Sequence, residues 1–98
     1  MYNIHVRESV ITDLEELTEY IFRATFSRES AEEVYDKIMA SIIGLKIFPF
    51  KYPIFEGNYR VMTVYNKYRI FYRVDKNNNE VIIQFIFSTD ENYHNLIK

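Results

Sequence analysis

The stretch Tyr59–Val74, YRVMTVYNKYRIFYRV, decides the fold of this chain. Two runs of strand-forming residues, Tyr59–Tyr65 and Tyr68–Val74, lie on either side of the polar pair Asn66-Lys67. Aromatic and β-branched side chains fill both runs, and such side chains favour a pleated, half-buried surface. A short polar break between two such runs is typical of a tight turn. The stretch therefore predicts an antiparallel β-hairpin.

The predicted hairpin combines apolar residues with concentrated positive charge. Side chains alternate between the two faces of a strand, so Arg69, Phe71 and Arg73 share one face of the second run. Arg60 shares a face of the first run with Met62 and Val64. From Tyr59 to Val74 there is no carboxylate, and the sequence has these four cations: Arg60, Lys67, Arg69 and Arg73.

Upstream of this stretch, the spacing of apolar residues changes to that of an amphipathic helix. Ser9 and Thr12 compete as the N-cap of this helix, and Thr12 with Glu15 makes a capping-box pattern. The apolar stripe recurs at steps of four, three, four and three: Val10, Leu14, Leu17, Ile21 and Ala24.

A second helix follows a short break around Phe26–Arg28. Ser30 with Glu33 offers another capping box, and Pro49 is expected to stop the helix. Because the connection is short and both helices have apolar stripes, they are predicted to form an antiparallel helical hairpin. The second stripe consists of Ala31, Val34, Ile38, Ile42 and Leu45.

Three further segments complete the predicted order βααβββ. Tyr2–Val6 alternates as a short first strand, and Phe48–Tyr59, with both prolines, predicts an irregular crossover. Val81–Phe87, VIIQFIF, is typical of a strand covered on both faces. The chain is therefore predicted to be α+β, with the helical hairpin packed on a small, mainly antiparallel twisted sheet. Tyr93, Leu96 and Ile97 are expected to dock a last short turn or helix.

Length and composition favour a single domain over residues 1–98. The chain is 48% hydrophobic and has nine Tyr, eight Phe and no Cys, so a core is expected to rely on aromatic burial rather than on disulfides. No signal peptide and no long apolar run is present, which predicts a cytoplasmic protein without a membrane segment. The net charge of −2 argues against a general nucleic-acid binder.

Few residues suggest chemistry. His5 and His94 lie far apart without ligand spacing, so neither a metal nor a cofactor is expected. The arginines Arg60, Arg69 and Arg73 have two interpretations that the sequence leaves open. They are either exposed strand residues that stack on tyrosines and pair with acids, or an anion-binding face for phosphate or for a partner's acidic residues. Tyr93 is likewise either a docking aromatic or a catalytic hydroxyl.

Four segments in this order resemble a known family. They are DLEELTEYI, LKIFPFKYPIF, VYNKYRIFYRV and VIIQFIFSTDENYHNLI, and the most specific of them contains Tyr68–Val74. Together they resemble the RelE/ParE superfamily of bacterial toxins, the toxic half of type II toxin–antitoxin pairs. The resemblance covers nearly the whole chain and implies the βααβββ fold, a cognate antitoxin as partner and a hetero-oligomer with it.

The superfamily that the chain resembles has two branches with different activities. In the branch that cleaves mRNA on the ribosome, cations on the sheet and a residue after the last strand act on RNA, and the corresponding catalytic residues here are Arg60, Arg69 and Tyr93. Two departures weaken this reading: Met62 and Ser88 stand where many relatives have a cation and a histidine. Asp90 and Glu91 oppose an RNA phosphate as well.

The ParE-like branch therefore fits better, and its members poison DNA gyrase without a hydrolytic site. The residues expected to bind a target or partner are Arg60, Arg69, Phe71 and Arg73. The antitoxin is expected to cover apolar grooves beside the helical hairpin and the sheet. An mRNA endoribonuclease and a non-toxic binding module with the same fold remain the alternatives.

Overall fold

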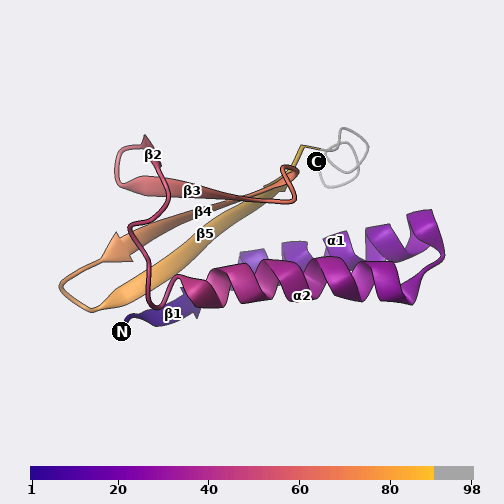
Figure 1. Cartoon of the computed structure of the whole chain (residues 1–98), viewed down its shortest axis with the longest axis horizontal. Coiled ribbons are helices and arrows are strands. Elements are labelled where there is room, and N and C mark those ends of the chain that lie inside the picture. The colour runs from indigo at the N-terminus through magenta and orange to yellow at the C-terminus, as the bar shows by residue number, and fades with distance from the viewer. Residues whose placement is uncertain (90–98) are drawn as a thin grey trace.

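The computed structural model describes residues 1–89, in which two helices pack on one side of a five-stranded sheet (Figure 1). The α+β class and the order of the predicted elements are confirmed. One strand is added, because β2 lies within the segment expected to be an irregular crossover. The elements are β1 (Asn3–Val6), α1 (Glu8–Thr25), α2 (Arg28–Gly44), β2 (Ile54–Glu56), β3 (Tyr59–Val64), β4 (Tyr68–Asp75) and β5 (Glu80–Ser88).

The sheet has the strand order β1-β5-β4-β3-β2. Three of its five strands, β3, β4 and β5, form an antiparallel meander, and β2 pairs antiparallel with β3 at one edge. At the other edge β1 runs parallel to β5, with Ile4 opposite Val81. The chain must therefore cross from β1 at one edge of the sheet to β2 at the opposite edge, and the two helices make that crossover.

The β3–β4 hairpin has its turn one residue earlier than the sequence predicted. Tyr65 and Asn66 have positive φ angles of 55° and 54°, and the amide of Lys67 donates a hydrogen bond of 3.1 Å to the carbonyl of Val64. Two central residues with positive φ are a feature of type I′ turns, whose twist matches that of the strands. The expectation that Tyr65 extends the first strand and that Asn66-Lys67 forms the turn was wrong.

The predicted helix N-caps were also wrong, because both helices begin earlier. Arg7 precedes α1 without a side-chain cap, so Ser9 and Thr12 lie inside the helix. At α2 the hydroxyl of Ser27 accepts a hydrogen bond of 3.1 Å from the amide of Ser30. Ser27 is therefore the cap, and Ser30 occupies the third position of the helix rather than its cap.

The core lies between the helices and the inner face of the sheet. The α1 stripe is buried from Val10 to Leu17, but Ala24 is exposed because the helical hairpin extends past the end of the sheet (Figure 1). Within residues 1–89, no helix is both long enough and apolar enough to span a bilayer. The fully buried side chains include Ile38, Ile42, Met62, Ile70, Tyr72 and Ile83.

Candidate binding surface on the open face of the sheet

The helices cover one face of the sheet and leave the opposite face, here called the open face, without a helical layer (Figure 1). The register of the strands shows which side chains meet there. Tyr59 pairs with Arg73, Arg73 with Ile82, and Ile82 with His5. One row across four strands thus brings together an aromatic ring, a guanidinium, an aliphatic side chain and an imidazole.

The next two rows of the open face are aromatic. Phe71 of β4 pairs with Phe85 of β5, and Arg69 pairs with Phe87. A β-bulge follows Phe71 in this register: Phe71 opposes Phe85, whereas Tyr72 opposes Ile83. Gln84 is therefore the extra residue. The bulge restores the alternation so that Phe85 and Phe87 share the open face with Phe71.

Five rings make up an aromatic cluster on this face: Phe55, Tyr59, Phe71, Phe85 and Phe87. The centroids of Phe55 and Phe71 lie 5.2 Å apart with the rings near perpendicular, and those of Phe71 and Phe87 lie 5.8 Å apart. Phe85 lies about equally far from Tyr59 and from Phe87, at 6.1 Å. The contacts of Phe71 with Phe55 and Phe87 are edge-to-face, at 77° and 78°, and the two contacts of Phe85 are tilted.

The aromatic cluster surrounds a shallow hollow of about 590 Å³, which also touches the β2–β3 turn at Gly57. Phe55 is 60% exposed, and Phe85 and Phe87 are each 42% exposed. The sequence-based expectation of a last strand covered on both faces was therefore wrong. The apolar run of β5 is continuous because one face enters the core and the other joins the cluster.

A polar hollow of about 450 Å³ lies beside the aromatic cluster. His5 and Arg7 reach it from the first strand and the residue after it, Arg73 from β4, and Glu80 and Gln84 from β5. Two guanidinium groups therefore face one carboxylate. Such a set favours hydrogen bonding to an anionic or strongly polar group of a ligand.

The carboxylate of Asp75 borders Arg73 along β4. Its two oxygens accept hydrogen bonds from the side chain of Asn78 at 2.8 Å and from the amide of Asn78 at 3.2 Å. These bonds, with a smaller contribution from Arg73, hold the pKa of Asp75 below its ordinary value. Asp75 thus stays charged and organises the turn between β4 and β5.

Arg60 does not lie on the open face. Its cross-strand partner is the buried Tyr72, so it projects on the helix side of the sheet. The Nη1 atom donates hydrogen bonds to the carbonyls of Tyr52 at 2.7 Å and Phe50 at 3.4 Å. The guanidinium also lies 5.2 Å from the centre of the Phe50 ring. Arg60 therefore fastens the segment between α2 and β2 to the sheet.

The predicted site residues thus divide into two groups. Arg69, Phe71 and Arg73 come together on the open face, and Arg60 lies on the opposite face. Across residues 1–89 the salt bridge that forms joins Arg23 to Glu19, so Arg69 and Arg73 form no salt bridge in this part of the chain, although the charge of Arg73 acts on Asp75. Tyr93 lies outside the described residues.

Sequence reasoning missed several residues of the open face, notably Phe55, Phe85, His5 and Arg7. The period-two alternation of Val81–Phe87 contained a signal for Phe85 and Phe87, but the bulge at Gln84 shifts that alternation. The pairing of β1 with β5, which brings His5 to Ile82, has no local signal in the sequence.

Two helices on one face of a β-meander, completed by a parallel first strand, define the fold class of RelE/ParE toxins. The family model for the ParE toxin of the type II toxin–antitoxin system parDE matches residues 4–93. The chain belongs to this family and is thus a toxin of the type II toxin–antitoxin class. No curated protein sequence matches the chain.

Solved structures support the same fold at low sequence identity. A chain of the chromosomal ParDE toxin–antitoxin system from P. aeruginosa is 15% identical, with a TM-score of 0.76 over 92% of this chain and 98% of that one. A chain of the RelBE2 toxin–antitoxin complex from Mycobacterium tuberculosis is 16% identical, with a TM-score of 0.63 over 89% and 96%. The conserved hypothetical protein HP0892 from Helicobacter pylori is 16% identical, with a TM-score of 0.51 over 91% and 96%.

Proposed function

We propose that this toxin arrests growth in the cytoplasm by binding an essential target, DNA gyrase, through the open face of its sheet, and that a cognate antitoxin neutralises it in a hetero-oligomer. The observation that carries the proposal is the aromatic cluster flanked by Arg69 and Arg73. Aromatic and arginine side chains dominate the hot spots of protein interfaces, and here they are gathered on one face without a covering layer.

The arrangement supports binding rather than RNA cleavage. Cleavage through a 2′-hydroxyl needs a proton acceptor and cations that converge on one phosphate. Arg60 and Arg69 are the cations that the cleavage hypothesis pairs, and they lie on opposite faces of the sheet. Met62, which occupies a position where relatives that cleave mRNA carry a cation, is 1% exposed in the core.

The exposed apolar surface supports an antitoxin partner. Phe55 is mostly exposed and Phe85 is partly exposed, and a chain of this size normally hides such a contiguous patch. A segment of the antitoxin that lies across the aromatic cluster removes this surface from water and blocks the target at the same time. Charge on Arg69 and Arg73 favours acidic residues at the ends of that segment.

The test is induction of the chain in cells, with parallel readouts for gyrase-linked DNA breaks and for mRNA cuts by primer extension. We expect DNA breaks to accumulate and mRNA to stay intact. The double substitution Phe71→Ala with Phe85→Ala is expected to relieve the arrest, and so is Arg69→Ala with Arg73→Ala. Lys37→Ala, a loss of charge on the exposed side of α2, serves as the matched control.

Two outcomes would count against the proposal. Ribosome-dependent mRNA cuts that disappear in Arg69→Ala would instead support the endoribonuclease. An absence of growth arrest, from a chain that circular dichroism shows to be folded, would support the non-toxic binding module.

A further inference from the structure

The polar hollow on the open face lies over three neighbouring strands, β1, β5 and β4 (Figure 1). Its floor is Ile82, which pairs with His5 on one side and with Arg73 on the other. Ile82 is only 7% exposed although no helix covers this face, so the side chains around it close over it. The hollow therefore has a packed apolar floor with polar groups at its sides.

The polar side chains of this hollow are not paired with other groups of the protein. Across residues 1–89, no side-chain hydrogen bond or salt bridge is formed by five of the lining residues: His5, Arg7, Arg73, Glu80 and Gln84. The charge of Arg73 acts on Asp75, but both oxygens of that carboxylate accept hydrogen bonds from Asn78. Two guanidinium groups, an imidazole and an amide are thus available to a ligand.

The number of donors favours a phosphate monoester over a carboxylate. Guanidinium groups bind both kinds of anion. A carboxylate presents two oxygens, whereas a phosphate monoester presents three strong acceptor oxygens and carries up to two negative charges. Arg7 and Arg73 against Glu80 give the lining a net charge of +1 with His5 neutral. A compact dianion therefore uses these donors more fully than a carboxylate does.

The aromatic cluster adjoins the polar hollow. Tyr59 is the cross-strand neighbour of Arg73, and Phe85 follows Gln84 along β5. Both rings line the aromatic hollow, and Phe85 is 42% exposed. Exposed aromatic side chains on a sheet stack on nucleobases. A base attached to a phosphate in the polar hollow therefore has a ring within reach.

We propose that the polar hollow and the rings beside it bind a nucleoside monophosphate, with the phosphate between Arg7 and Arg73 and the base on Tyr59 or Phe85. The same chemistry occurs in a free nucleotide and at the 5′-phosphorylated end of a nucleic-acid strand. A site for one terminal phosphate is compatible with the acidic total charge, because binding along a strand needs a row of cations. The site is independent of the proposed action on gyrase, because its ligand is small and Arg7 is not part of the proposed target surface.

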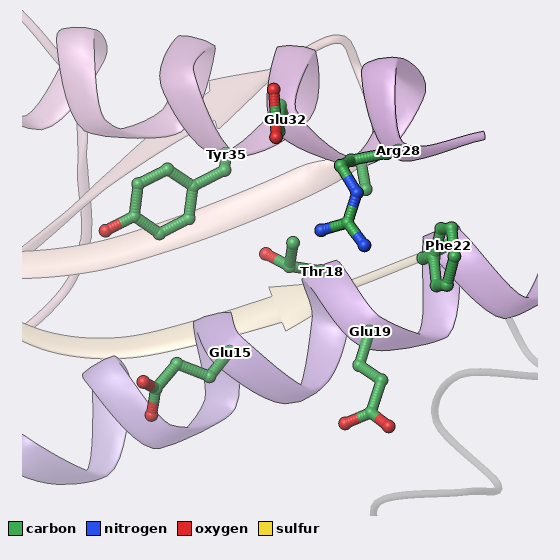
Figure 2. A pocket seen from close by; sticks show the side chains of 8 residues that line it. Glu15, Thr18, Glu19, Phe22, Arg28, Glu32 and Tyr35 are labelled. Atoms are coloured by element: carbon green, nitrogen blue, oxygen red, sulfur yellow. The ribbon is translucent and has the colours of Figure 1, made fainter.

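A hollow on the helical hairpin provides a matched comparison. It occupies about 320 Å³ between α1 and α2, and the guanidinium of Arg28 in it lies 5.3 Å from the centre of the Phe22 ring. Because this cation is already engaged and carboxylates surround it, an anion is disfavoured there. Arg7 and Arg28 both stand at the start of a helix, so Arg28→Gln removes the same charge at an equivalent place. Figure 2 shows the three carboxylate side chains that line this hollow: Glu15, Glu19 and Glu32.

The probe is adenosine 5′-monophosphate (AMP), and isothermal titration calorimetry measures its binding to the whole chain. Adenosine lacks the phosphate and ribose 5-phosphate lacks the base, so these two compounds separate the two halves of the site. We expect each of them to bind about fivefold or more weakly than AMP.

An adenosine trinucleotide with and without a 5′-phosphate distinguishes the two sources of the ligand. The phosphorylated form should bind more tightly than the unphosphorylated form. Tighter binding of the phosphorylated form than of AMP would assign the site to the end of a strand, and weaker binding would assign it to a free nucleotide. Both results support the proposed chemistry.

Three substitutions test the lining of the hollow. Arg7→Gln should weaken AMP binding about tenfold or more, because a charge-assisted hydrogen bond is lost, and Arg28→Gln should weaken it less than about twofold. Glu80→Gln should strengthen AMP binding about threefold or more, because the repulsion of the phosphate is removed. A gain of affinity cannot result from a damaged fold, and circular dichroism checks the fold of all three variants.

Four results would overturn the inference. AMP that fails to bind at concentrations up to about 5 mM would remove the site, and equal binding of adenosine would remove the role of the phosphate. Equal weakening by Arg7→Gln and Arg28→Gln would mean diffuse attraction rather than a site. Tighter binding of an acidic dipeptide of tyrosine and glutamate than of AMP would assign the hollow to a protein carboxylate. None of these results bears on gyrase inhibition, which growth arrest and DNA breaks measure separately.

Discussion

At the residue scale, two side chains hold the segment before β2 against the sheet. Tyr72 is fully buried, and its hydroxyl donates a hydrogen bond of 2.7 Å to the carbonyl of Pro49. Arg60 binds the carbonyls of Phe50 and Tyr52 a few residues further on. A segment with two prolines has few amides for sheet hydrogen bonds, so these side-chain bonds take their place.

Substitution of Tyr72 by phenylalanine should therefore lower the free energy of unfolding by about 1 kcal/mol at neutral pH, because the Pro49 carbonyl loses its donor. Burial raises the pKa of Tyr72 to about 12. The unfolded chain loses this proton near pH 10 and the folded chain near pH 12, so stability falls as the pH rises between those values, by about 2–3 kcal/mol.

Urea denaturation at pH 7, 9 and 11 measures both effects. Tyr72→Phe should show a shallower alkaline loss than the parent chain, whereas Tyr65→Phe, at an exposed position, should leave the slope unchanged. Identical slopes in all three proteins would show that Tyr72 does not hold its proton as described.

Arg60→Ala is predicted to lower stability rather than to remove activity selectively. The substitution deletes hydrogen bonds from a charged group to two carbonyls, at a cost of about 1–2 kcal/mol. The melting temperature should fall accordingly, and growth arrest should persist at temperatures below it. Arg69→Ala and Arg73→Ala should show the reverse pattern, with an unchanged melting temperature and relieved arrest. Loss of arrest in a folded Arg60→Ala protein would contradict this division.

At the element scale, the end of α1 carries an unfavourable residue. Phe26 follows the helix with a φ of 54°, and its amide donates a hydrogen bond of 2.7 Å to the carbonyl of Phe22. This left-handed position normally holds glycine, because other residues suffer a steric penalty there. The ring is 89% exposed, so it contributes little to the core.

Phe26→Gly should consequently raise the free energy of unfolding by about 1 kcal/mol, because glycine adopts the left-handed conformation without a steric penalty; urea denaturation measures the change. Phe26→Ala, which removes the ring but keeps the Cβ atom, is the control and should change stability much less. A loss of stability in the glycine variant would mean that the ring makes a stabilising contact.

The elements in which apolar residues recur at a regular spacing were predictable from the sequence, and the other elements were not. The apolar stripes that begin at Val10 and at Ala31 predicted the two helices, and the alternation within Tyr59–Val74 predicted the β-hairpin. The short strand β2 was missed because Pro53 and exposed residues surround it. The prediction of the helix N-caps was wrong because several serines and threonines near the start of each helix satisfy the same pattern. The folded structure alone shows that Ser27 is the cap of α2.

The candidate surface was predictable to a similar degree. Alternation along β4 correctly grouped Arg69, Phe71 and Arg73, because no bulge interrupts β4 itself. Arg60 was wrongly placed in the same binding set, because the alternation along one strand does not say how its faces align with those of the next; the pairing of Arg60 with the buried Tyr72 puts it on the helix side. The sequence held no signal that Phe22 and Tyr35 line one pocket, because they lie beside the predicted stripes and come together only when α1 packs on α2.

At the scale of the whole molecule, two exposed surfaces of opposite character face away from each other. The open face combines rings with arginines, whereas the outer side of the helical hairpin combines the rings of Phe22 and Tyr35 with carboxylates. The molecule is elongated, with extents of 44 × 24 × 23 Å, which separates the end of the hairpin from the sheet.

The uncovered aromatic cluster predicts that the isolated chain binds the dye ANS in its native state. Phe71→Ser with Phe85→Ser should lower ANS fluorescence by about half, because Phe71 contacts both Phe55 and Phe87, and Phe85 is 42% exposed beside them, so their loss breaks up the contiguous apolar patch. Phe26→Ser, which removes an isolated exposed ring, should lower it much less. Equal effects would mean that the dye does not recognise the cluster.

The parallel pairing of β1 with β5 has a consequence for synthesis of the chain on the ribosome. The strand made first has its partner 77 residues downstream, since Asn3 pairs with Glu80, which corresponds to a delay of roughly 4–15 s at usual rates of translation. Until β5 emerges, β4 lacks a neighbour on one side and the row from Tyr59 to His5 cannot form. A nascent chain in which β5 has not yet been made therefore has no assembled open face, so any binding through that face has to wait for β5.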